Sequence, residues 1–193
     1  MNQTSAEMVR DQDAAKAPHV PQIERLAHVG IFVRDLETSI HFYRDILGLT
    51  MSDDDREHGL VFLSSHPDDE HHEVLLTTGR TVPIEAKLIQ QISFRCPTLA
   101  DVIAYWRRLV ENNVKIMYTI THGNAIACYF FDPDDNICEV YWRTGLKARQ
   151  GFLIGVDLNK PEEELLAFVR QAVAEHGKTG YVDMELLATQ KIG

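Results

Sequence analysis

The sequence lacks the long apolar runs and the cysteine pairs that mark several classes of protein. No stretch approaches 18 consecutive apolar residues, so no membrane-spanning helix is predicted. The first 22 residues hold no apolar segment of the kind that a secretory signal needs. The three cysteines form no C-x-x-C pair, which argues against a disulfide framework or a zinc ribbon. These absences predict a cytoplasmic protein in a reducing environment.

Basic residues are also scarce. The chain has 19 Lys and Arg against 29 Asp and Glu, which gives a formal net charge of −10. A protein of this sign repels nucleic acid and anionic lipid, so neither is an expected partner. Apolar residues make up 45% of the 193 residues, an ordinary globular proportion that is sufficient for a proper core.

The apolar pattern divides the chain into three regions. Residues 1–21 are polar, contain Pro18 and Pro21, and are predicted to form a flexible N-terminal arm. Residues 22–148 alternate between strand-like and helix-like patterns and are predicted to form the main domain. Residues 149–193 form a C-terminal extension with a helix capped by Asn159 and ended by Gly177.

The main domain contains an internal repeat. A shift of 63 residues carries one set of helix-spaced residues onto another, namely Leu36, Ile40, Tyr43 and Leu47 onto Leu99, Ile103, Trp106 and Val110. Strand-like patterns flank both helices, at residues 26–33, 60–64 and 74–78, and again at 88–96, 115–120, 126–131 and 138–142. The acidic residues 53–57 are predicted to form a solvated loop.

The repeat predicts the α+β class, with two tandem βαβββ modules at about residues 24–80 and 86–145. One such module cannot cover both faces of its own sheet. The two are therefore expected to pack as one domain around a half-open barrel cavity, followed by the C-terminal helical tail.

Three polar residues lie on the predicted strands at related positions. The same shift of 63 carries His28 onto Gln91, and Glu139 lies in the last strand. If the modules pair about a pseudo-twofold axis, an imidazole, an amide and a carboxylate converge on one cavity as candidate metal ligands. The alternative is structural: His28 as a core histidine bonded to a carbonyl, and Gln91 as a polar residue paired with backbone.

Two segments resemble one family. The stretch YFFDPDDNICEVY, residues 129–141, is similar to the last hairpin of the vicinal oxygen chelate superfamily. The stretch LAHVGIFVRDLETSIHFYRDILGL, residues 26–49, resembles the first strand and helix of such a module. The superfamily includes extradiol catechol dioxygenases, glyoxalase I and fosfomycin-resistance enzymes. The resemblance covers about residues 24–145 and is greatest to single-domain type I extradiol dioxygenases.

The resemblance implies a metal site. The extradiol pattern places metal ligands at His28 and Glu139. It also expects a histidine where this sequence has Gln91, and a neutral amide oxygen binds Fe(II) less tightly than imidazole. Fe(II) is the expected metal, with Mn, Ni or Zn as alternatives.

The resemblance also implies a reaction. His72, His122 and Tyr129 match the substrate-side catalytic residues of extradiol enzymes. The implied substrates are O₂ and a small catechol-type aromatic diol, as in the catabolism of aromatic compounds. The arm and the tail favour a homo-oligomer.

Two other functions fit the same scaffold. Some glyoxalases use a glutamine ligand, and His28, Glu73, Gln91 and Glu139 reproduce the composition of their four-ligand site. The second alternative is a metal-free protein that binds a small molecule, as among bleomycin-resistance relatives. Neighbouring strand residues point to opposite faces, so His72 facing the cavity favours ring cleavage and Glu73 facing it favours the isomerase.

Overall fold

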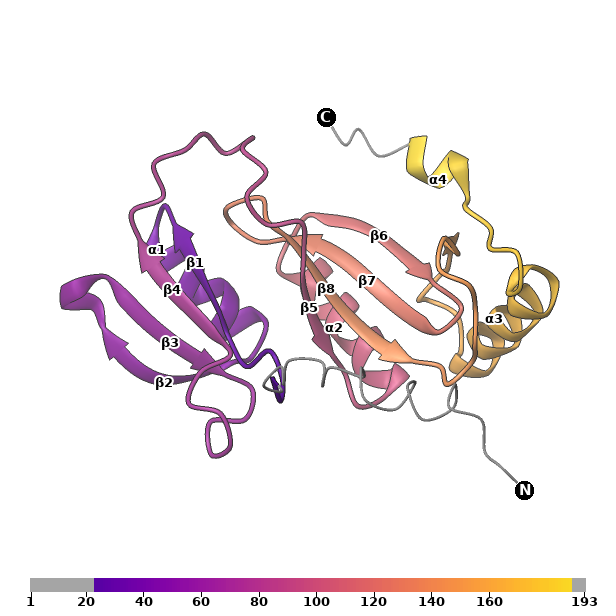
Figure 1. Cartoon of the computed structure of the whole chain (residues 1–193), viewed down its shortest axis with the longest axis horizontal. Helices are drawn as coiled ribbons and strands as arrows, with labels where there is room; N and C mark the ends of the chain where they lie inside the picture. The colour runs from indigo at the N-terminus through magenta and orange to yellow at the C-terminus, as the bar shows by residue number, and fades with distance from the viewer. Residues whose placement is uncertain (1–22, 189–193) are drawn as a thin grey trace, which may run out of the picture.

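Two open sheets and the helices that cover them make up the structure, a computed structural model that describes residues 23–188 (Figure 1). The first sheet has four strands in the order β1-β4-β3-β2, and the second has five in the order β5-β8-β7-β6-β9. The predicted α+β class and the repeated βαβββ plan are confirmed. The predicted N-terminal arm, residues 1–21, lies outside the described residues.

The first module contains four strands and one bent helix. In each module the first strand lies parallel to the last, and the remaining pairs are antiparallel. The elements are β1 (Val29–Val33), α1 (Leu36–Ile40), a π-helical continuation η1 (His41–Ile46), β2 (Thr50–Asp55), a 3₁₀ turn η2 (Arg56–His58), β3 (Leu60–Ser64) and β4 (Val74–Thr78).

The second module repeats this plan and extends it by one short strand. Its helix starts with a capping box, in which the Thr98 hydroxyl accepts from the Asp101 N–H and the Asp101 carboxylate accepts from the Thr98 N–H. The elements are β5 (Ile92–Arg95), α2 (Leu99–Glu111), β6 (Ile116–Thr121), β7 (Ala125–Phe131), β8 (Ile137–Arg143) and β9 (Ile154–Gly155).

The tail forms two helices, α3 (Glu162–His176) and α4 (Met184–Ala188). The predicted helix is α3, and it ends at Gly177 as expected. Its first cap differs from the prediction, because Pro161 occupies the N-cap position. Asn159 instead hydrogen-bonds to Asp157, two residues earlier, in a turn that precedes the helix.

One predicted loop is a strand. Thr50–Asp55 forms β2, so the acidic residues Asp53 to Asp55 lie in a sheet. The strand has an edge position and pairs only with β3, so its charged side chains reach water while its backbone is hydrogen-bonded. The strands β1 and β5 are also shorter than predicted, which places His28 and Gln91 just before them.

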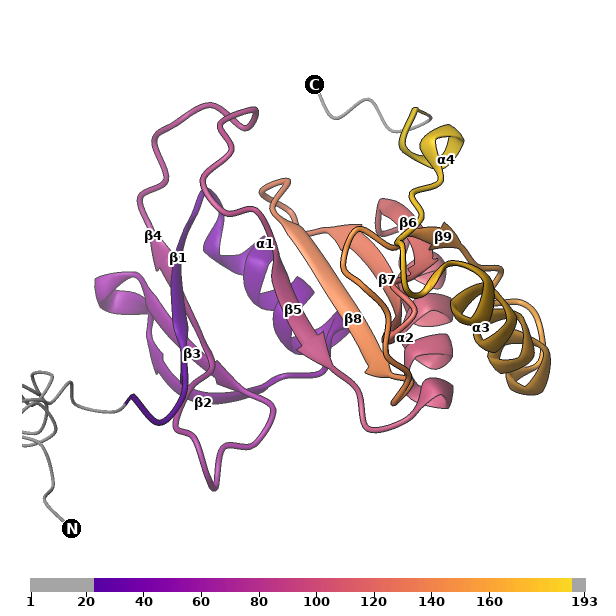
Figure 2. The same cartoon turned by 45° about the vertical axis from the view of Figure 1, so that its right-hand side comes forward.

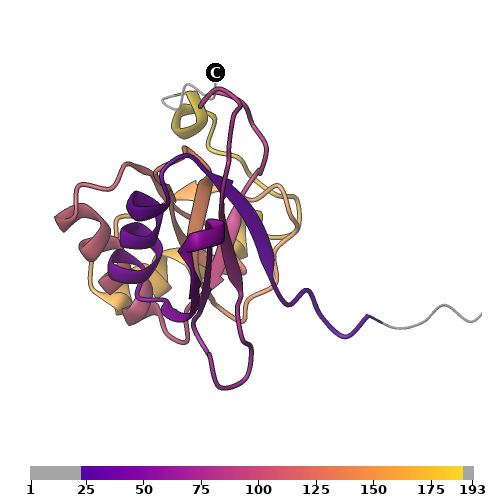
Figure 3. The ribbon, with the colours of Figure 1, turned by 90° about the vertical axis from the view of Figure 1, so that its left-hand side faces the viewer.

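The helices of the two modules lie on the same side of the molecule (Figures 1 and 2). Viewed from the first module, α1 covers one face of the first sheet only (Figure 3). On the second sheet, α2 covers one face and Leu186 of α4 packs against part of the other. No helix within residues 23–188 has the length and apolar character needed to cross a bilayer.

The two modules share one apolar core. Buried side chains of α1, α2 and the helix-side faces of both sheets form a single cluster, in which the rings of Phe42 and Phe130 lie 6.2 Å apart. Burial of this kind contributes about 25 cal/mol for each Å² of apolar surface removed from water. The relative placement of the modules is therefore fixed by packing.

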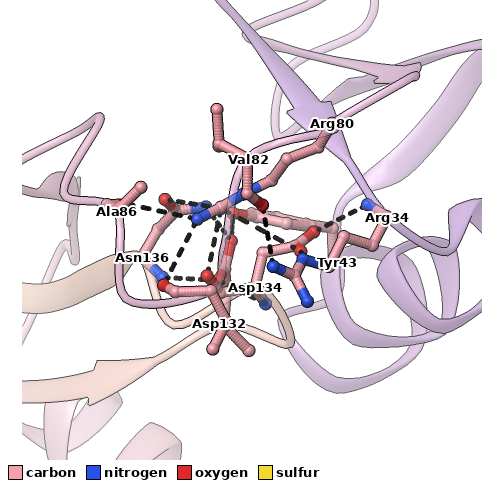
Figure 4. Close-up of polar contacts among 9 residues, drawn as sticks. Arg34, Tyr43, Arg80, Val82, Ala86, Asp132, Asp134 and Asn136 are labelled. Carbon is pink, nitrogen blue, oxygen red and sulfur yellow. Dashed lines mark hydrogen bonds and ion pairs between the residues drawn. The ribbon is translucent and has the colours of Figure 1, made fainter.

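A buried polar network reinforces this junction (Figure 4). Asp132 lies in the turn between β7 and β8, and the Tyr43 hydroxyl donates a hydrogen bond to Asp132 Oδ2 at 2.9 Å. Arg80 donates to the carbonyl oxygen of Asp134 at 3.0 Å, and the backbone N–H of Arg34 donates to the Asp134 carboxylate at 3.2 Å. Burial raises the pKa of Asp132, while its hydrogen bonds to Asn136 and Tyr43 oppose that rise. The network ties the hairpin of the second module to the first.

Candidate metal and substrate site

Glu139 lies at the centre of the second sheet's uncovered face. It is 5% exposed, and the strand registers place it directly opposite Tyr129 on β7 and beside Ser93 on β5. Side chains alternate along strands, so these three residues form a row across one face while Cys128, Cys138 and Val140 point to the helix side.

Neutral donors satisfy the Glu139 carboxylate. Ser93 Oγ donates to Glu139 Oε2 at 2.5 Å, and Gln91 Nε2 donates to the same oxygen at 3.2 Å. Gln91 Nε2 also lies 2.7 Å from Ser93 Oγ. None of these partners carries a positive charge, so Glu139 forms no ion pair with them.

Tyr129 and His122 form a second polar pair in the same place. The Tyr129 hydroxyl lies 3.2 Å from His122 Nε2, and His122 Nδ1 lies 2.8 Å from the carbonyl oxygen of Phe152. A carbonyl only accepts, so Nδ1 carries the proton of this hydrogen bond, and Nε2 is the ring nitrogen that faces Tyr129. Burial, and then the charge of Glu139, raise the pKa of Tyr129, so its hydroxyl remains a donor at neutral pH.

These groups line a cavity of about 580 Å³. Four of the six predicted site residues are among its walls: Gln91, His122, Tyr129 and Glu139. The full lining is mostly polar and consists of Gln90, Gln91, Tyr118, His122, Asn124, Ala125, Tyr129, Glu139, Tyr141, Arg143 and Gln150.

The other two predicted site residues lie together on the first sheet. The rings of His28 and His72 have centroids 4.3 Å apart, and Phe62 packs edge-on against His72 at 5.1 Å. Burial, and then the neighbouring His28 and His71, lower the pKa of His72, which favours its neutral form.

Glu73 points to a different place from His72. Its carboxylate accepts hydrogen bonds from the Ser65 N–H at 2.6 Å and from Ser65 Oγ at 2.5 Å. His72, and not Glu73, therefore faces His28. Neither residue lines the cavity on the second sheet, so the strand-alternation criterion does not separate ring cleavage from the four-ligand isomerase.

The two groups do not meet within one chain. Among residues 23–188, no hydrogen bond, ion pair or ring contact joins His28 or His72 to Gln91 or Glu139. The same part of the chain holds no cluster of three His, Cys, Asp or Glu side chains placed to bind a metal. His28 is exposed and lies before an edge strand of its own sheet, and the packed junction between modules holds the two sheets apart.

Sequence reasoning missed Ser93, which donates to Glu139, and several lining residues, among them Tyr118 and Arg143. Ser93 and Arg143 follow from alternation, since Ser93 is two residues after Gln91 and Arg143 is four after Glu139. Tyr118 does not, because an irregularity between Ile116 and Tyr118 resets the pairing of β6 with β7.

The donor set in the cavity fits a divalent metal. A carboxylate and an amide lie within hydrogen-bond distance of each other, and oxygen ligands of this type suit Mn(II) and similar hard ions. Gln91 must present Oε1 instead of Nε2 to serve as a ligand. Imidazole from His28 would complete the predicted set.

Residues 25–140 match the Glyoxalase/Bleomycin resistance protein/Dioxygenase superfamily. A curated relative, the manganese-dependent 2,3-dihydroxybiphenyl 1,2-dioxygenase of Geobacillus genomosp. 3, is 28% identical over 124 residues. That match covers 63% of this chain and 37% of the relative, so the chain corresponds to well under half of that enzyme.

Solved structures of smaller proteins match almost over their full length. The fosfomycin resistance protein FosX of Listeria monocytogenes, in its monoclinic form, has a TM-score of 0.52 and 18% identity. The match covers 62% of this chain and 92% of FosX. Lactoylglutathione lyase from Agrobacterium tumefaciens has a TM-score of 0.50 and 19% identity, and the match covers 63% of this chain and 96% of the lyase. At these identities the likeness shows a shared fold.

Proposed function

Because the chain belongs to the glyoxalase, bleomycin resistance and dioxygenase superfamily, we propose that it is an extradiol dioxygenase that opens a catechol-type aromatic diol with O₂. The observation that carries this proposal is the site on the second sheet. There the buried Glu139 lies beside Gln91, and the hydrogen-bonded Tyr129 and His122 face the same cavity. The manganese-dependent dioxygenase among the relatives supports the same reaction class.

We propose His28, Gln91 and Glu139 as the metal ligands, with Fe(II) as the metal. Mn(II) is the first alternative, since the dioxygenase relative is named as manganese-dependent, and Ni or Zn follow. These residues would hold the metal, whose chemistry when bound would be to acidify a diol hydroxyl and to bind O₂. Because the amide of Gln91 is a weaker ligand than imidazole, we expect this site to lose its metal more readily than a site with two histidines.

The remaining residues orient the substrate and move protons. The Tyr129 hydroxyl, kept protonated by burial, is placed to donate its hydrogen bond to a substrate oxygen in place of His122 Nε2. His122, held by the carbonyl of Phe152, fixes the orientation of Tyr129. His72, whose lowered pKa favours the neutral ring, is proposed to accept a proton from the diol.

The assembly is part of the proposal. Packing and the Tyr43–Asp132 and Arg80–Asp134 contacts fix the two sheets of one chain, so simple closure cannot bring His28 to Glu139. We propose a homodimer in which His28 and His72 of one copy complete the cavity of the other. Phe32 on the same sheet, 60% exposed, offers apolar surface for this contact. Light scattering of the purified protein should give twice the mass of one chain, and a monomer that cleaves catechol would contradict this part.

Oxygen uptake with catechol tests the reaction. Protein purified without oxygen and loaded with Fe(II) or Mn(II) should consume O₂ and form the yellow ring-opened semialdehyde. Tyr129→Phe should lower kcat by about 100-fold, the usual scale for a lost proton-transfer or orienting group. Tyr181→Phe is the matched control, since Tyr181 stacks on His176 away from the cavity. Loss of turnover in both variants, or in neither, would contradict the role of Tyr129.

A glyoxalase-type isomerase is the second candidate, and the observation that favours it is the glutamine at position 91. Its fourth ligand would have to be Glu73, whose carboxylate is held by Ser65. Nickel-loaded protein tested with the hemithioacetal of methylglyoxal and glutathione separates the two candidates. Isomerisation without O₂ uptake, lost in Glu73→Gln, would replace the dioxygenase proposal.

A further inference from the structure

The cavity on the second sheet has two chemically different ends. The register of β7 and β8 places Tyr129 opposite Glu139, Ala127 opposite Tyr141 and Ala125 opposite Arg143. All six residues share the face that carries the cavity. The end at Glu139 is therefore acidic and the end at Arg143 is basic, with the Tyr141–Ala127 pair between them.

Tyr141 lies between these two ends of the row and lines the cavity together with Ala125. Ala127 is fully buried by its neighbours and offers no surface to a ligand. Glu139 and Arg143 are four residues apart, which corresponds to about 13 Å along a strand. An aromatic diol with a short side chain, bound by its hydroxyls near Glu139, would cover part of this distance. The extended Arg143 side chain would cover the rest.

Arg143 is unengaged and stands out by its charge. Its side chain makes no hydrogen bond or ion pair with any other residue in the range 23–188, while its backbone pairs with Ala125 in the sheet. It is also the single Lys or Arg in the lining, in a chain whose formal net charge is −10. An acidic protein repels acidic ligands in general, so a free guanidinium in a cavity wall gives that wall a local preference for an anion.

We propose that Arg143 is a specificity residue and that the substrate is an aromatic diol carrying a carboxylate on a short side chain. The diol lies at the Glu139 end, the ring lies over Tyr141, and the carboxylate pairs with the Arg143 guanidinium. This inference rests on the proposed ring-cleavage function and names the class of diol that the site takes.

The test compares two substrates that differ only in charge, dihydroxyphenylacetate and its methyl ester, in the metal-loaded protein. The wild type should favour the free acid in kcat/KM. In Arg143→Gln that preference should fall by about tenfold, the effect of one charge-assisted hydrogen bond of about 1.4 kcal/mol. Added salt should weaken the wild-type preference, because the arginine is exposed.

The controls separate the two claims. Arg143→Lys should keep part of the preference, and Arg107→Gln, on helix α2 behind the sheet, should keep all of it. If wild type and Arg143→Gln turn over both compounds in the same ratio, the role of Arg143 is wrong while ring cleavage stands. If neither compound consumes O₂, the proposed function itself fails.

Discussion

The two modules share one plan but present very different surfaces for chemistry. On the second sheet, Glu139 and Tyr129 are each 5% exposed and engage polar neighbours within a defined cavity. On the first sheet, the exposed His28 lies just before β1, and its main neighbour is another histidine. Two modules with the same plan therefore present different side chains. The second has a buried carboxylate and a tyrosine in a polar cavity, and the first has two neighbouring imidazoles.

The largest effect is expected at the preorganised half. Glu139→Gln keeps the shape of the side chain and its hydrogen bond from Ser93, but it removes the proposed anionic ligand. We expect activity to fall by at least about 100-fold, because losing a ligand exceeds the usual loss from a residue that only supports one. Metal content of the purified variant, with circular dichroism to verify folding, is the measurement. A variant that retains metal and turnover would show that Glu139 has a structural role.

A substitution that gives both modules a histidine at the equivalent position should have a smaller effect, and it should raise metal affinity instead of lowering it. Gln91→His places in the second module the residue that the first has at position 28. Imidazole binds Fe(II) more tightly than an amide oxygen, so we expect metal affinity to rise by about tenfold. Competition with a chelator measures this. The control is Gln90→His, at the neighbouring lining position, which should leave the affinity unchanged.

The buried tyrosine of the second sheet predicts a modest effect at high pH. Burial and the Glu139 charge raise the pKa of Tyr129 above its ordinary value of 10.0, so above that pH the unfolded chain releases a proton that the folded protein retains. Stability should therefore fall as the pH rises past 10.0. Denaturant unfolding should show a less steep alkaline loss in Tyr129→Phe than in wild type. In Tyr181→Phe the loss should match wild type, and equal slopes in all three proteins would contradict the assignment.

The elements with clear periodicity were predictable from the sequence. The apolar spacing from Leu99 to Val110 gave α2, and the acidic start after Pro161 gave α3. The strand β2 was not predictable in this way, because Thr50–Asp55 carries mainly polar side chains and is stabilised by its pairing with β3 at a sheet edge. Local pattern is informative only where one face of an element is buried.

The site was predictable in part for the same reason. The positions of Gln91 and Glu139 on neighbouring strands followed from the repeat, and their side chains lie 3.2 Å apart. The distance from His28 to Glu139 depends on how the modules pack. That packing is set by contacts between residues far apart in the sequence, such as Tyr43 with Asp132 and Phe42 with Phe130. No repeat or spacing encodes such contacts.

A mixing experiment tests most directly whether the two unlike halves meet between copies. His28→Ala and Glu139→Ala proteins should each be inactive in ring cleavage. Unfolded together and refolded, they should form mixed dimers with one intact site, restoring about a quarter of wild-type activity for a symmetric dimer with random pairing. If the mixture stays inactive while wild type treated identically recovers, His28 and Glu139 do not act across two copies.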